Sequence, residues 1–546
     1  MKRTITFLLC LSAFILNAQL KFVIEDFEGF ADGNTDFKIN GIFTYGNIKA
    51  SVDKFPSDQH SYSGQRYLKM NKDPDLAKKM NYGGWGKGIG LNLVLDPQKD
   101  YLNFYLLQSD TNSFKIELQE DDNEDNVYNK DNDDSWIYVQ KSEAGSRRND
   151  WRLISIPLNK FTDANPGGDG IMNINYKHGK LLCFIINFLP RKTAGEGNLA
   201  ASFDFICFSQ GKLLTGKDNF DAPEATTADA CNLGAWSKEG NTANFADIPT
   251  SFENNFKCTK KLGVAHFFQP FAFDGSSSQN LYPSIERINQ VIQQGYIPMI
   301  TLENHFVNSS PGLKQPNLYS IVEGHFDPFF TAWAKQVRQV NGTVLLRILH
   351  EFNGDWYPWC LVNNDRNPFL LINAYRHIHD IFKSQQVSNV KFIWCPNSVS
   401  WPQEKWNYIM DSYPGNEYVD YLGLDVYNGA GKGTPVWRSF RKEGIENYFI
   451  LTQQLPDKPL FICETASRER KSSESLLSQS KAEWIRQMSE ALQSDMCKVR
   501  LLTWFNEKET FRINSTPEAA SAFANYILKE NYFKSGAANL NALIKK

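Results

Sequence analysis

The chain has 546 residues, of which 42% are hydrophobic and 22% charged, so it is long enough for several folded domains and is not of the disordered class. Its 58 lysines and arginines against 61 aspartates and glutamates give a net charge of −3, which argues against a generally basic nucleic-acid binder. Aromatic residues reach 14%, a content typical of a large core or of a surface that stacks on sugar rings.

The N-terminus has the pattern of a targeting segment. Lys2 and Arg3 precede an apolar stretch, residues 4–16, that is too short to span a bilayer, and Ala18 supplies a small residue for cleavage. We predict a secretory signal peptide over residues 1–18 and a secreted or periplasmic location. No later run of 18 apolar residues occurs, so no transmembrane segment is predicted.

Residues 20–213 are predicted to form a β-sandwich of the jelly-roll type. Short segments rich in aromatic and β-branched residues alternate with loops rich in Gly, Asp and Asn. The acidic loop 121–134 lacks the glycine and the final glutamate of an EF-hand, so we interpret it as a solvated connection. The predicted strands include 101–107, 113–118, 136–140, 151–157 and 181–188.

A polar, proline-containing segment, residues 214–230, predicts a linker, and the pattern changes after it. Eight apolar runs alternate with helical patterns over residues 231–535, which predicts a (β/α)8 TIM barrel, and residues 536–546 are expected to be a tail. The whole chain is therefore predicted to be multidomain, a β-sandwich followed by a barrel. The predicted barrel strands are 231–236, 262–268, 296–303, 343–351, 390–397, 419–428, 458–467 and 498–506. The predicted helices are 283–294, 328–340, 367–386, 441–455, 475–494 and 517–530.

Two glutamates of these apolar runs are the leading candidates for chemistry, Glu351 in LLRILHEFNGDWYPW and Glu464 in PLFICETAS. Active sites of such barrels lie at the carboxyl ends of the strands, so we expect both side chains at one barrel mouth. One protonated and one ionised carboxylate there would suit glycoside hydrolysis, with a gap of roughly 5 Å for retention of configuration and a larger gap for inversion. The alternative for either glutamate is a buried ion pair with Arg347.

The same segments resemble glycoside hydrolase family 26, in the clan of retaining barrel glycosidases. RILHEFNGDWYPW looks like its acid/base motif, KPLFICETAS like its nucleophile strand and LLTWFN like its last strand, and YVDYLGLDVYN and FIWCPN also fit. The resemblance covers about residues 230–530 and implies that Glu351 is the general acid/base and Glu464 the nucleophile. Cys463 is an alternative nucleophile, but strand alternation predicts that it faces away from Glu464.

The resemblance also implies substrate-binding roles. His350 is expected near the cleaved bond, Trp356 on the leaving-group side, Tyr427 against the nucleophile and Trp504 under the sugar being cleaved. Arg347 is expected to point inward like Glu351, because the two are four residues apart in a strand, and to help keep Glu464 ionised. Further candidates for subsites or for structural packing are Glu303, Asn304, His305, Asp425, Trp359, Trp394, Trp401 and Trp406.

The function implied is that of a retaining endo-β-glycanase acting on polysaccharide and oligosaccharide, with β-1,4-mannan as the leading substrate. Mixed-linkage β-glucan and β-1,3-xylan stay open, as do an inverting enzyme and a catalytically inactive glycan-binding protein. We expect a monomer that needs no cofactor for catalysis.

The N-terminal region resembles carbohydrate-binding modules of the jelly-roll type through VIEDFEGF, NYGGWGKGIGLNL, NDWRLISIPLNKF and ASFDFICF. The resemblance implies a candidate structural calcium at Glu28 and Asp204. Trp85 and Trp136 are candidates for stacking on polysaccharide. Such a module, tethered to a hydrolase, would raise the local concentration of substrate.

Overall fold

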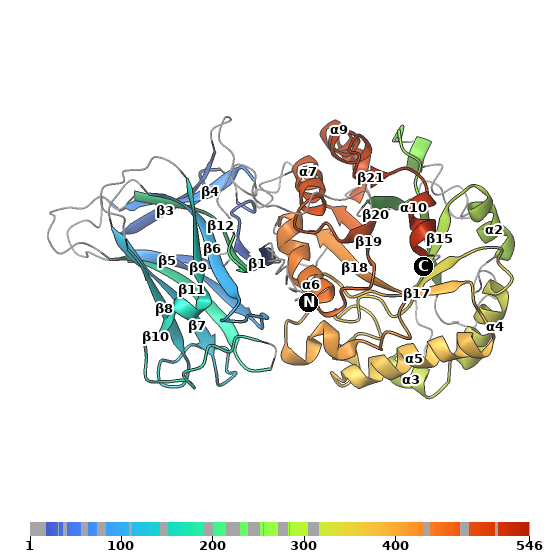
Figure 1. Cartoon of the computed structure of the whole chain (residues 1–546), viewed down its shortest axis with the longest axis horizontal. Helices are drawn as coiled ribbons and strands as arrows, with labels where there is room; N and C mark the ends of the chain where they lie inside the picture. The colour runs from blue at the N-terminus through green and yellow to red at the C-terminus, as the bar shows by residue number, and fades with distance from the viewer. Residues whose placement is uncertain are drawn as a thin grey trace, which may run out of the picture.

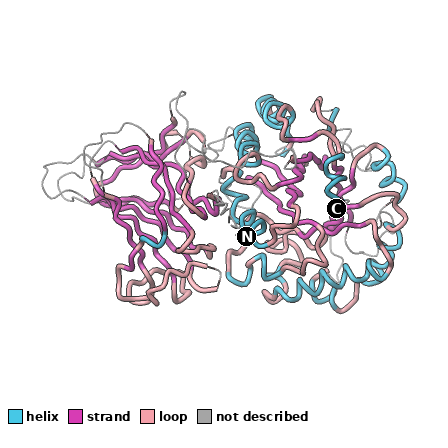
Figure 2. Tube along the Cα trace, viewed as in Figure 1, coloured by secondary structure: helices cyan, strands magenta, loops and turns pink. Residues whose placement is uncertain are grey.

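In the computed structural model, a β-sandwich and a barrel lie side by side (Figure 1). Strands dominate the first part, whereas helices surround the strands of the second (Figure 2). The structure describes residues 18–30, 32–35, 41–55, 64–73, 83–108, 112–141, 151–175, 177–189, 200–213, 230–237, 252–254, 256–270, 282, 284–303, 316–429, 437–469, 480–507 and 511–544. The predicted signal peptide up to residue 17, residues 214–229 of the predicted linker, Asn304 and His305 lie outside this range.

The N-terminal part consists of two antiparallel sheets, which confirms the predicted β-sandwich. In short strands such as β7 (Ser113–Asp121), buried residues alternate with half-buried ones, so one face of the sheet packs into the core. The first sheet contains β1 (Gln19–Glu25), β3 (Ile48–Lys54), β4 (Arg66–Lys72), β6 (Asp100–Gln108), β9 (Arg152–Pro157) and β12 (Ala200–Gln210). The second contains β2 (Ile42–Gly46), β5 (Gly83–Leu91), β7 (Ser113–Asp121), β8 (Ser135–Gln140), β10 (Thr162–Asp163) and β11 (Lys180–Leu189).

Two tryptophans predicted to stack on polysaccharide lie in the interior of the sandwich. Trp85 is fully buried and makes edge contacts with Phe184 and Phe27. Trp136 is buried as well, and its indole N–H donates to Glu120 at 2.8 Å. The stacking prediction is therefore wrong for both residues, because their side chains belong to the core that holds the two sheets together.

The acidic loop between β7 and β8 is only partly a solvated connection. Its middle residues are exposed, as predicted, but Asp121, Asp133 and Asp134 at its ends are buried. The side chain of Asp133 accepts the backbone N–H groups of Asp122 and Asn129, so it folds the loop back on itself.

The C-terminal part is a closed barrel of eight parallel strands, as predicted. Neighbouring strands follow the chain order, and the first strand closes the barrel by pairing with the last. The eight strands are β13 (Cys231–Ser237), β14 (Val264–Pro270), β15 (Ile297–Glu303), β16 (Val344–Arg347), β17 (Val390–Trp394), β18 (Tyr421–Asn428), β19 (Leu460–Ser467) and β20 (Val499–Asn506). A short strand, β21 (Phe533–Lys534), adds to β13 outside the barrel.

Helices follow the strands where side-chain caps and apolar faces favour them. Ser284, Asn367, Ser439 and Ser480 each accept a backbone N–H at the start of a helix. The helices are α2 (Ile285–Gln293), α3 (Leu318–Val322), α4 (Asp327–Val337), α5 (Pro368–Ser384), α6 (Phe440–Gln454), α7 (Lys481–Leu492), α9 (Pro517–Phe523) and α10 (Ala538–Ile544). Helix α10 replaces the expected tail: Leu540 and Ile544 pack into the same core cluster as Met299 and Leu345 of the barrel strands.

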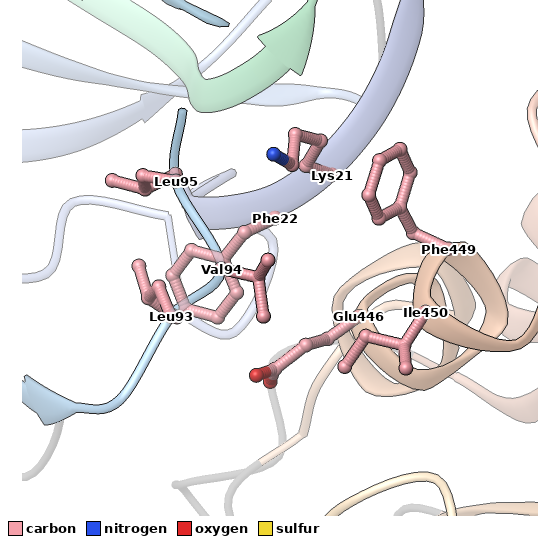
Figure 3. Close-up of a pocket in the computed structure, with 8 residues that line it drawn as sticks. All are labelled: Lys21, Phe22, Leu93, Val94, Leu95, Glu446, Phe449 and Ile450. Carbon is pink, nitrogen blue, oxygen red and sulfur yellow. The ribbon is translucent and has the colours of Figure 1, made fainter. Parts of the chain in front are cut away.

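The sandwich is fixed to the barrel by buried contacts between β1 and α6. Glu25 binds Lys442 of α6 at 2.7 Å and Lys87 of β5 at 2.5 Å, and Asp26 accepts the hydroxyl of Ser439 at 2.5 Å. Burial by itself would raise the pKa of Glu25, but the two lysines lower it to about 2. Apolar side chains beside them, among them Phe22 and Phe449, face each other across the junction (Figure 3). The two parts therefore share an interface as well as a connecting segment.

Within the described residues, the structure has no helix that is long and apolar enough to cross a membrane.

Candidate active site

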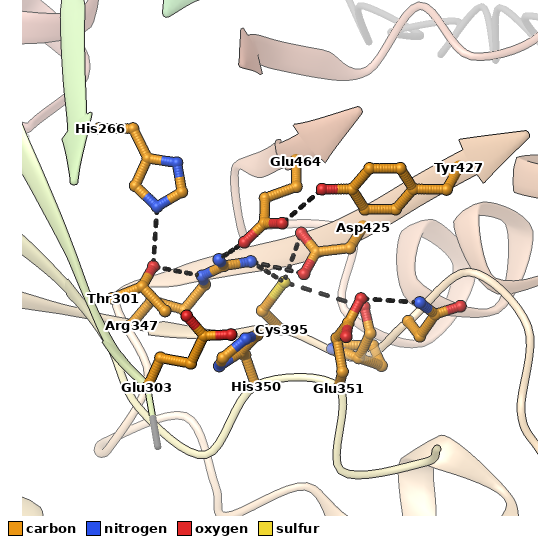
Figure 4. A network of polar contacts seen from close by, with 12 residues as sticks. His266, Thr301, Glu303, Arg347, His350, Glu351, Cys395, Asp425, Tyr427 and Glu464 are labelled. Carbon is orange, nitrogen blue, oxygen red and sulfur yellow. Dashed lines mark hydrogen bonds and ion pairs between the residues drawn. The ribbon is translucent and has the colours of Figure 1, made fainter. Parts of the chain in front are cut away.

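A buried arginine organises the carboxyl end of the barrel strands. Arg347 ends β16, and its guanidinium is fully buried. Its Nε donates to Thr301 Oγ1 at 2.8 Å, its Nη1 donates to Asp425 Oδ2 at 2.5 Å, and its Nη2 donates to Glu464 Oε1 (Figure 4). One cation thus binds side chains from β15, β18 and β19, which brings the ends of distant strands into one site.

Glu464 lies on β19 with 6% of its surface exposed, so it is nearly buried but can be reached from the barrel mouth. One carboxylate oxygen accepts from Arg347, and the other accepts the phenol O–H of Tyr427 at 2.5 Å. Charged and hydroxyl donors of this kind stabilise a carboxylate. This carboxylate is therefore held in one orientation and in a form suited to act as a nucleophile.

Glu351 lies in the loop after β16, because the strand ends at Arg347 and not at residue 351 as predicted. Leu349 and Glu351 adopt φ values of 49° and 52°, a left-handed conformation that side chains other than glycine seldom take. The backbone N–H of Glu351 donates to the carbonyl of Cys395 at 2.8 Å, which ties this turn to β17. The acidic side chain is thus placed by a strained turn instead of by strand alternation.

Two side chains orient the carboxyl group of Glu351. Asn397 donates its amide N–H to Oε1 at 2.8 Å, and Trp356 donates its indole N–H to Oε2 at 2.7 Å. Burial, and after it the negative charge of Asp425, raise the pKa of Glu351 to about 8. Glu351 therefore holds its proton at neutral pH, as a general acid must.

Asp425 is the third carboxyl group of the site and is fully buried. Burial raises its pKa to about 6, although the Arg347 guanidinium beside it acts in the opposite direction. Cys395 Sγ donates to its second oxygen at 3.4 Å. Cys395, Asp425 and Cys463 have candidate metal-ligand atoms within 4.8 Å of one another, but Arg347 already provides the positive charge at this point.

The alternation that was expected to separate Cys463 from Glu464 fails. The pairing of β18 with β19 shifts register between Leu424 and Asp425, so that Asp425 pairs with Glu464. As a consequence, Cys463 lies beside Asp425 in the barrel interior while Glu464 binds Arg347 on the same side. The prediction of opposite faces is therefore wrong, and the cause is a local bulge in the strand.

Aromatic and polar side chains line the rim beside Glu351. His350 Nε2 lies 3.1 Å from the hydroxyl of Tyr357, and this hydroxyl donates to Glu303 at 2.8 Å. Trp356 is 47% exposed and Trp401 is 60% exposed. The backbone N–H of Trp401 donates to the carbonyl of Asn353 at 2.7 Å, so the exposed indole is anchored to the loop that carries Glu351.

A family model, Glycosyl hydrolase family 26, matches residues 303–457. This part of the chain is therefore similar to glycosyl hydrolase family 26. The match includes Arg347, Glu351, Asp425 and Tyr427 and ends just before β19, which carries Glu464. The matched region thus contains Arg347 and its partner Asp425, whereas its partners Thr301 and Glu464 lie outside it.

Two curated relatives illustrate the similarity. Endoglucanase H of Acetivibrio thermocellus is 32% identical over 277 residues, which are 49% of this chain and 28% of that protein. A mannan endo-1,4-beta-mannosidase of Bacillus subtilis is 29% identical over 97 residues, 17% of this chain and 25% of that protein. The chain therefore matches about a quarter of the length of each relative.

Solved structures of similar shape include two mannanases. The Podospora anserina GH26-CBM35 beta-(1,4)-mannanase has 12% identity and a TM-score of 0.40, and the alignment covers 90% of this chain and 97% of that chain. A Cellulomonas fimi endo-beta-1,4-mannanase double mutant has 14% identity and a TM-score of 0.44, with coverage of 59% and 75%.

The structure brings six of the predicted site residues together in the barrel. Glu464 accepts hydrogen bonds from Arg347 and Tyr427, and Glu351 accepts one from Trp356. His350, the neighbour of Glu351 in the chain, lies within hydrogen-bond distance of Tyr357. They are Arg347, His350, Glu351, Trp356, Tyr427 and Glu464. Their roles in the reaction stay predictions.

Trp504 is not at the barrel mouth. It is 1% exposed, packs edge-on against Trp484 and Phe523 of the surrounding helices, and donates its indole N–H to the carbonyl of Phe511. Its neighbour Phe505 instead lies against the ring of Tyr427, with the ring centroids 6.0 Å apart. The motif LLTWFN contains both residues. Because successive side chains of a strand point to opposite sides, one of the two must face the barrel interior, but the motif alone does not show which one.

The other candidates divide between core and surface. Trp359 and Trp394 are buried, whereas Trp401 is exposed. Residues that sequence analysis missed are Thr301, Asn397, Tyr357 and Phe505, which orient the charged side chains or line the site. Tyr357, Asn397 and Phe505 lie inside the motifs RILHEFNGDWYPW, FIWCPN and LLTWFN, and Thr301 lies near the end of a strand-like run, which is the signal that the sequence offers for them.

The proposed calcium ligands of the sandwich, Glu28 and Asp204, have other contacts. Glu28 Oε1 accepts the backbone N–H groups of Gln65 and Arg66, and Asp204 accepts that of Phe205. Neither belongs to the two groups of three candidate metal ligands found in the described residues. A calcium ion at this pair stays a prediction.

Proposed function

We propose that the barrel is a retaining endo-β-glycanase in which Glu464 is the nucleophile and Glu351 the general acid/base. The observation that carries this proposal is the difference between the two glutamates. Glu464 accepts from Arg347 and Tyr427, whereas burial and Asp425 raise the pKa of Glu351 to about 8. One ionised and one protonated carboxyl group at a barrel mouth are the pair that double displacement requires.

In the first step, Glu464 attacks the anomeric carbon while Glu351 transfers its proton to the departing glycosidic oxygen. Trp356 holds the proton donor through its indole N–H, and its exposed ring lies where the leaving sugar would pass. In the second step, Glu351 takes a proton from water, which attacks the glycosyl-enzyme ester and releases Glu464. Esterification removes the negative charge of Glu464, which lowers the pKa of Glu351 and favours its role as a base.

The leading substrate is β-1,4-mannan, because several of the relatives are named mannan endo-1,4-beta-mannosidases. Mixed-linkage β-glucan is the second candidate, since the longest of these alignments is to an endoglucanase. The exposed rings of Trp356 and Trp401 offer apolar faces that either sugar chain can cover.

Reducing-sugar release from mannan, mixed-linkage β-glucan and β-1,3-xylan tests the proposal. We expect activity on one of these polymers and a rapid drop in chain length, as internal cleavage requires. Proton NMR of early products should show the β-anomer first. Early α-anomer would mean inversion, and silence on all three polymers would favour a glycan-binding protein without catalytic activity.

A further inference from the structure

We propose that Glu120, Asp122 and Asp134 form a calcium-binding site in the β-sandwich. Glu120 lies near the end of β7, Asp122 begins the acidic loop, and Asp134 ends it just before β8. One ligand atom from each residue lies within 4.8 Å of the other two. The pairing of β7 with β8, which sets Leu118 opposite Trp136, brings these positions together although they are up to 14 residues apart.

The contacts of these carboxylates in the described residues are N–H donors and include no lysine or arginine. Glu120 accepts from the Trp136 indole and from the backbone of Asn173. Asp122 accepts the backbone N–H of Asp134, and Asp134 accepts that of Gly170. Glu120 and Asp134 are fully buried, and no cationic side chain of the described residues contacts them, which is an unfavourable setting for a carboxylate.

One oxygen of the group is left without a hydrogen bond. Asp134 Oδ1 is buried and accepts no hydrogen bond from the described residues. It points at the same spot as Asp122 Oδ2, because a Cβ built on Gly168 would lie 2.1 Å from the former and 2.7 Å from the latter. Gly168 has a φ of 73° and, as a glycine, places no Cβ in the spot next to these two oxygens. A cation placed there would satisfy the free oxygen and offset the repulsion between the carboxylates.

The donor set selects the kind of cation. All three side chains offer carboxylate oxygens, and no histidine or cysteine joins the group. Such hard oxygen ligands favour calcium over zinc or copper, and calcium accepts irregular geometry with water completing its shell. The loop has none of the spacing of an EF-hand, so this site is built by the sheet and not by a contiguous sequence motif.

The loop that this site would hold reaches the barrel. Glu124 in its exposed part forms an ion pair with Lys405, and Lys180 binds both Asn126 of the loop and Glu404 at 3.3 Å. Residues 404 and 405 follow shortly after the exposed Trp401 on the rim of the candidate active site. Calcium at this point would therefore stabilise the sandwich and its second contact with the barrel.

Calcium titration of the full chain after treatment with EGTA tests the site. With CaCl2 alone, isothermal titration calorimetry should give one binding event per chain that depends on these residues, and calcium should raise the Tm by several degrees. Asp134→Asn and Asp122→Asn should each weaken that binding at least tenfold and remove the rise in Tm. The matched control is Asp131→Asn, an exposed aspartate of the same loop, which should bind calcium like the wild type.

Terbium luminescence provides a second measurement that does not depend on a variant folding. Trp136 lies next to Glu120, so terbium bound in the wild-type protein should be sensitised by tryptophan excitation and displaced by CaCl2. Absence of calcium binding in the wild type, or equal calcium binding in Asp134→Asn and the wild type, would overturn the proposal. A terbium signal that calcium does not displace would overturn it as well.

Discussion

Two groups of three buried or nearly buried carboxyl side chains lie in this molecule, and they differ in their counter-charge. In the barrel, Asp425 and Glu464 share the guanidinium of Arg347, and Glu351 stands beside them. In the sandwich, the carboxylates of Glu120, Asp122 and Asp134 are held only by N–H donors in the described residues.

The difference shows two solutions to the same electrostatic problem. Burial of several carboxylates is unfavourable unless a cation or a proton offsets their charge. The barrel offsets Asp425 and Glu464 with an internal cation and keeps a proton on Glu351. In the sandwich, no lysine or arginine among the described residues contacts the group, which is why we infer that it takes a cation from solution.

The largest expected effect is on turnover. Glu464→Gln keeps the size of the side chain but cannot form the glycosyl ester, so polymer hydrolysis should fall by at least about 10⁴-fold, the scale for loss of a covalent nucleophile. Reducing-sugar release measures it. Glu417→Gln, at an exposed site of the barrel, is the control and should stay within about twofold. A residual activity above a tenth of wild type would contradict the assignment.

Replacement of the proposed general acid/base should reduce turnover less than replacement of the proposed nucleophile, and the reduction should depend on the substrate. Glu351→Gln is expected to lower kcat/KM on polysaccharide by about 10²–10⁴-fold, since proton transfer to the leaving oxygen is lost. An aryl glycoside with an acidic phenol needs little protonation, so its cleavage should suffer much less. Comparison of kcat/KM on the two substrates checks this, and an equal loss on both would refute the role of proton donor.

Removal of the internal cation should make the barrel group resemble the sandwich group. Arg347→Met leaves Asp425 and Glu464 buried without a counter-charge, so the free energy of unfolding should fall by about 3–5 kcal/mol. Urea denaturation monitored by tryptophan fluorescence measures the change. Arg347→Lys should lose less, and Arg338→Met on the exposed face of the barrel should change stability by at most about 0.5 kcal/mol. Wild-type stability of Arg347→Met would show that the arginine is not what offsets these charges.

The smallest expected effect is a shift in pH dependence. Because the pKa of Glu351 is about 8, kcat/KM should decline as the pH rises through that value and the acid loses its proton. Asp425→Asn removes a nearby negative charge, which lowers the pKa of Glu351, so the alkaline limb should move to lower pH by roughly one unit. The profile of kcat/KM from pH 5 to 10 tests it, with Asp380→Asn as an exposed control. An unmoved limb would mean that Asp425 does not act on Glu351.

Sequence patterns predicted the fold and the two catalytic candidates but not the local geometry of either group. Runs such as 296–303 and 458–467 predicted their strands because their apolar residues are continuous, and they correspond to β15 and β19. The turn that places Glu351 and the bulge at Cys463 escaped prediction, since both break the alternation on which the inference rested. Whether Trp504 or Phe505 lies at the site depended on which side of β20 faces the barrel interior. The sequence of a single strand does not reveal that side.

The sequence by itself determined that a sandwich precedes a parallel barrel and that two glutamates are candidates for the site at the barrel mouth, because periodicity and apolar runs are local properties of the chain. Tertiary structure alone decided how charges meet: which carboxylates share Arg347, and that Glu120 and Asp134 come together across a strand pair. The physical reason is that electrostatic energy depends on distance in space and on burial, and neither is fixed until strands far apart in the chain pair in register.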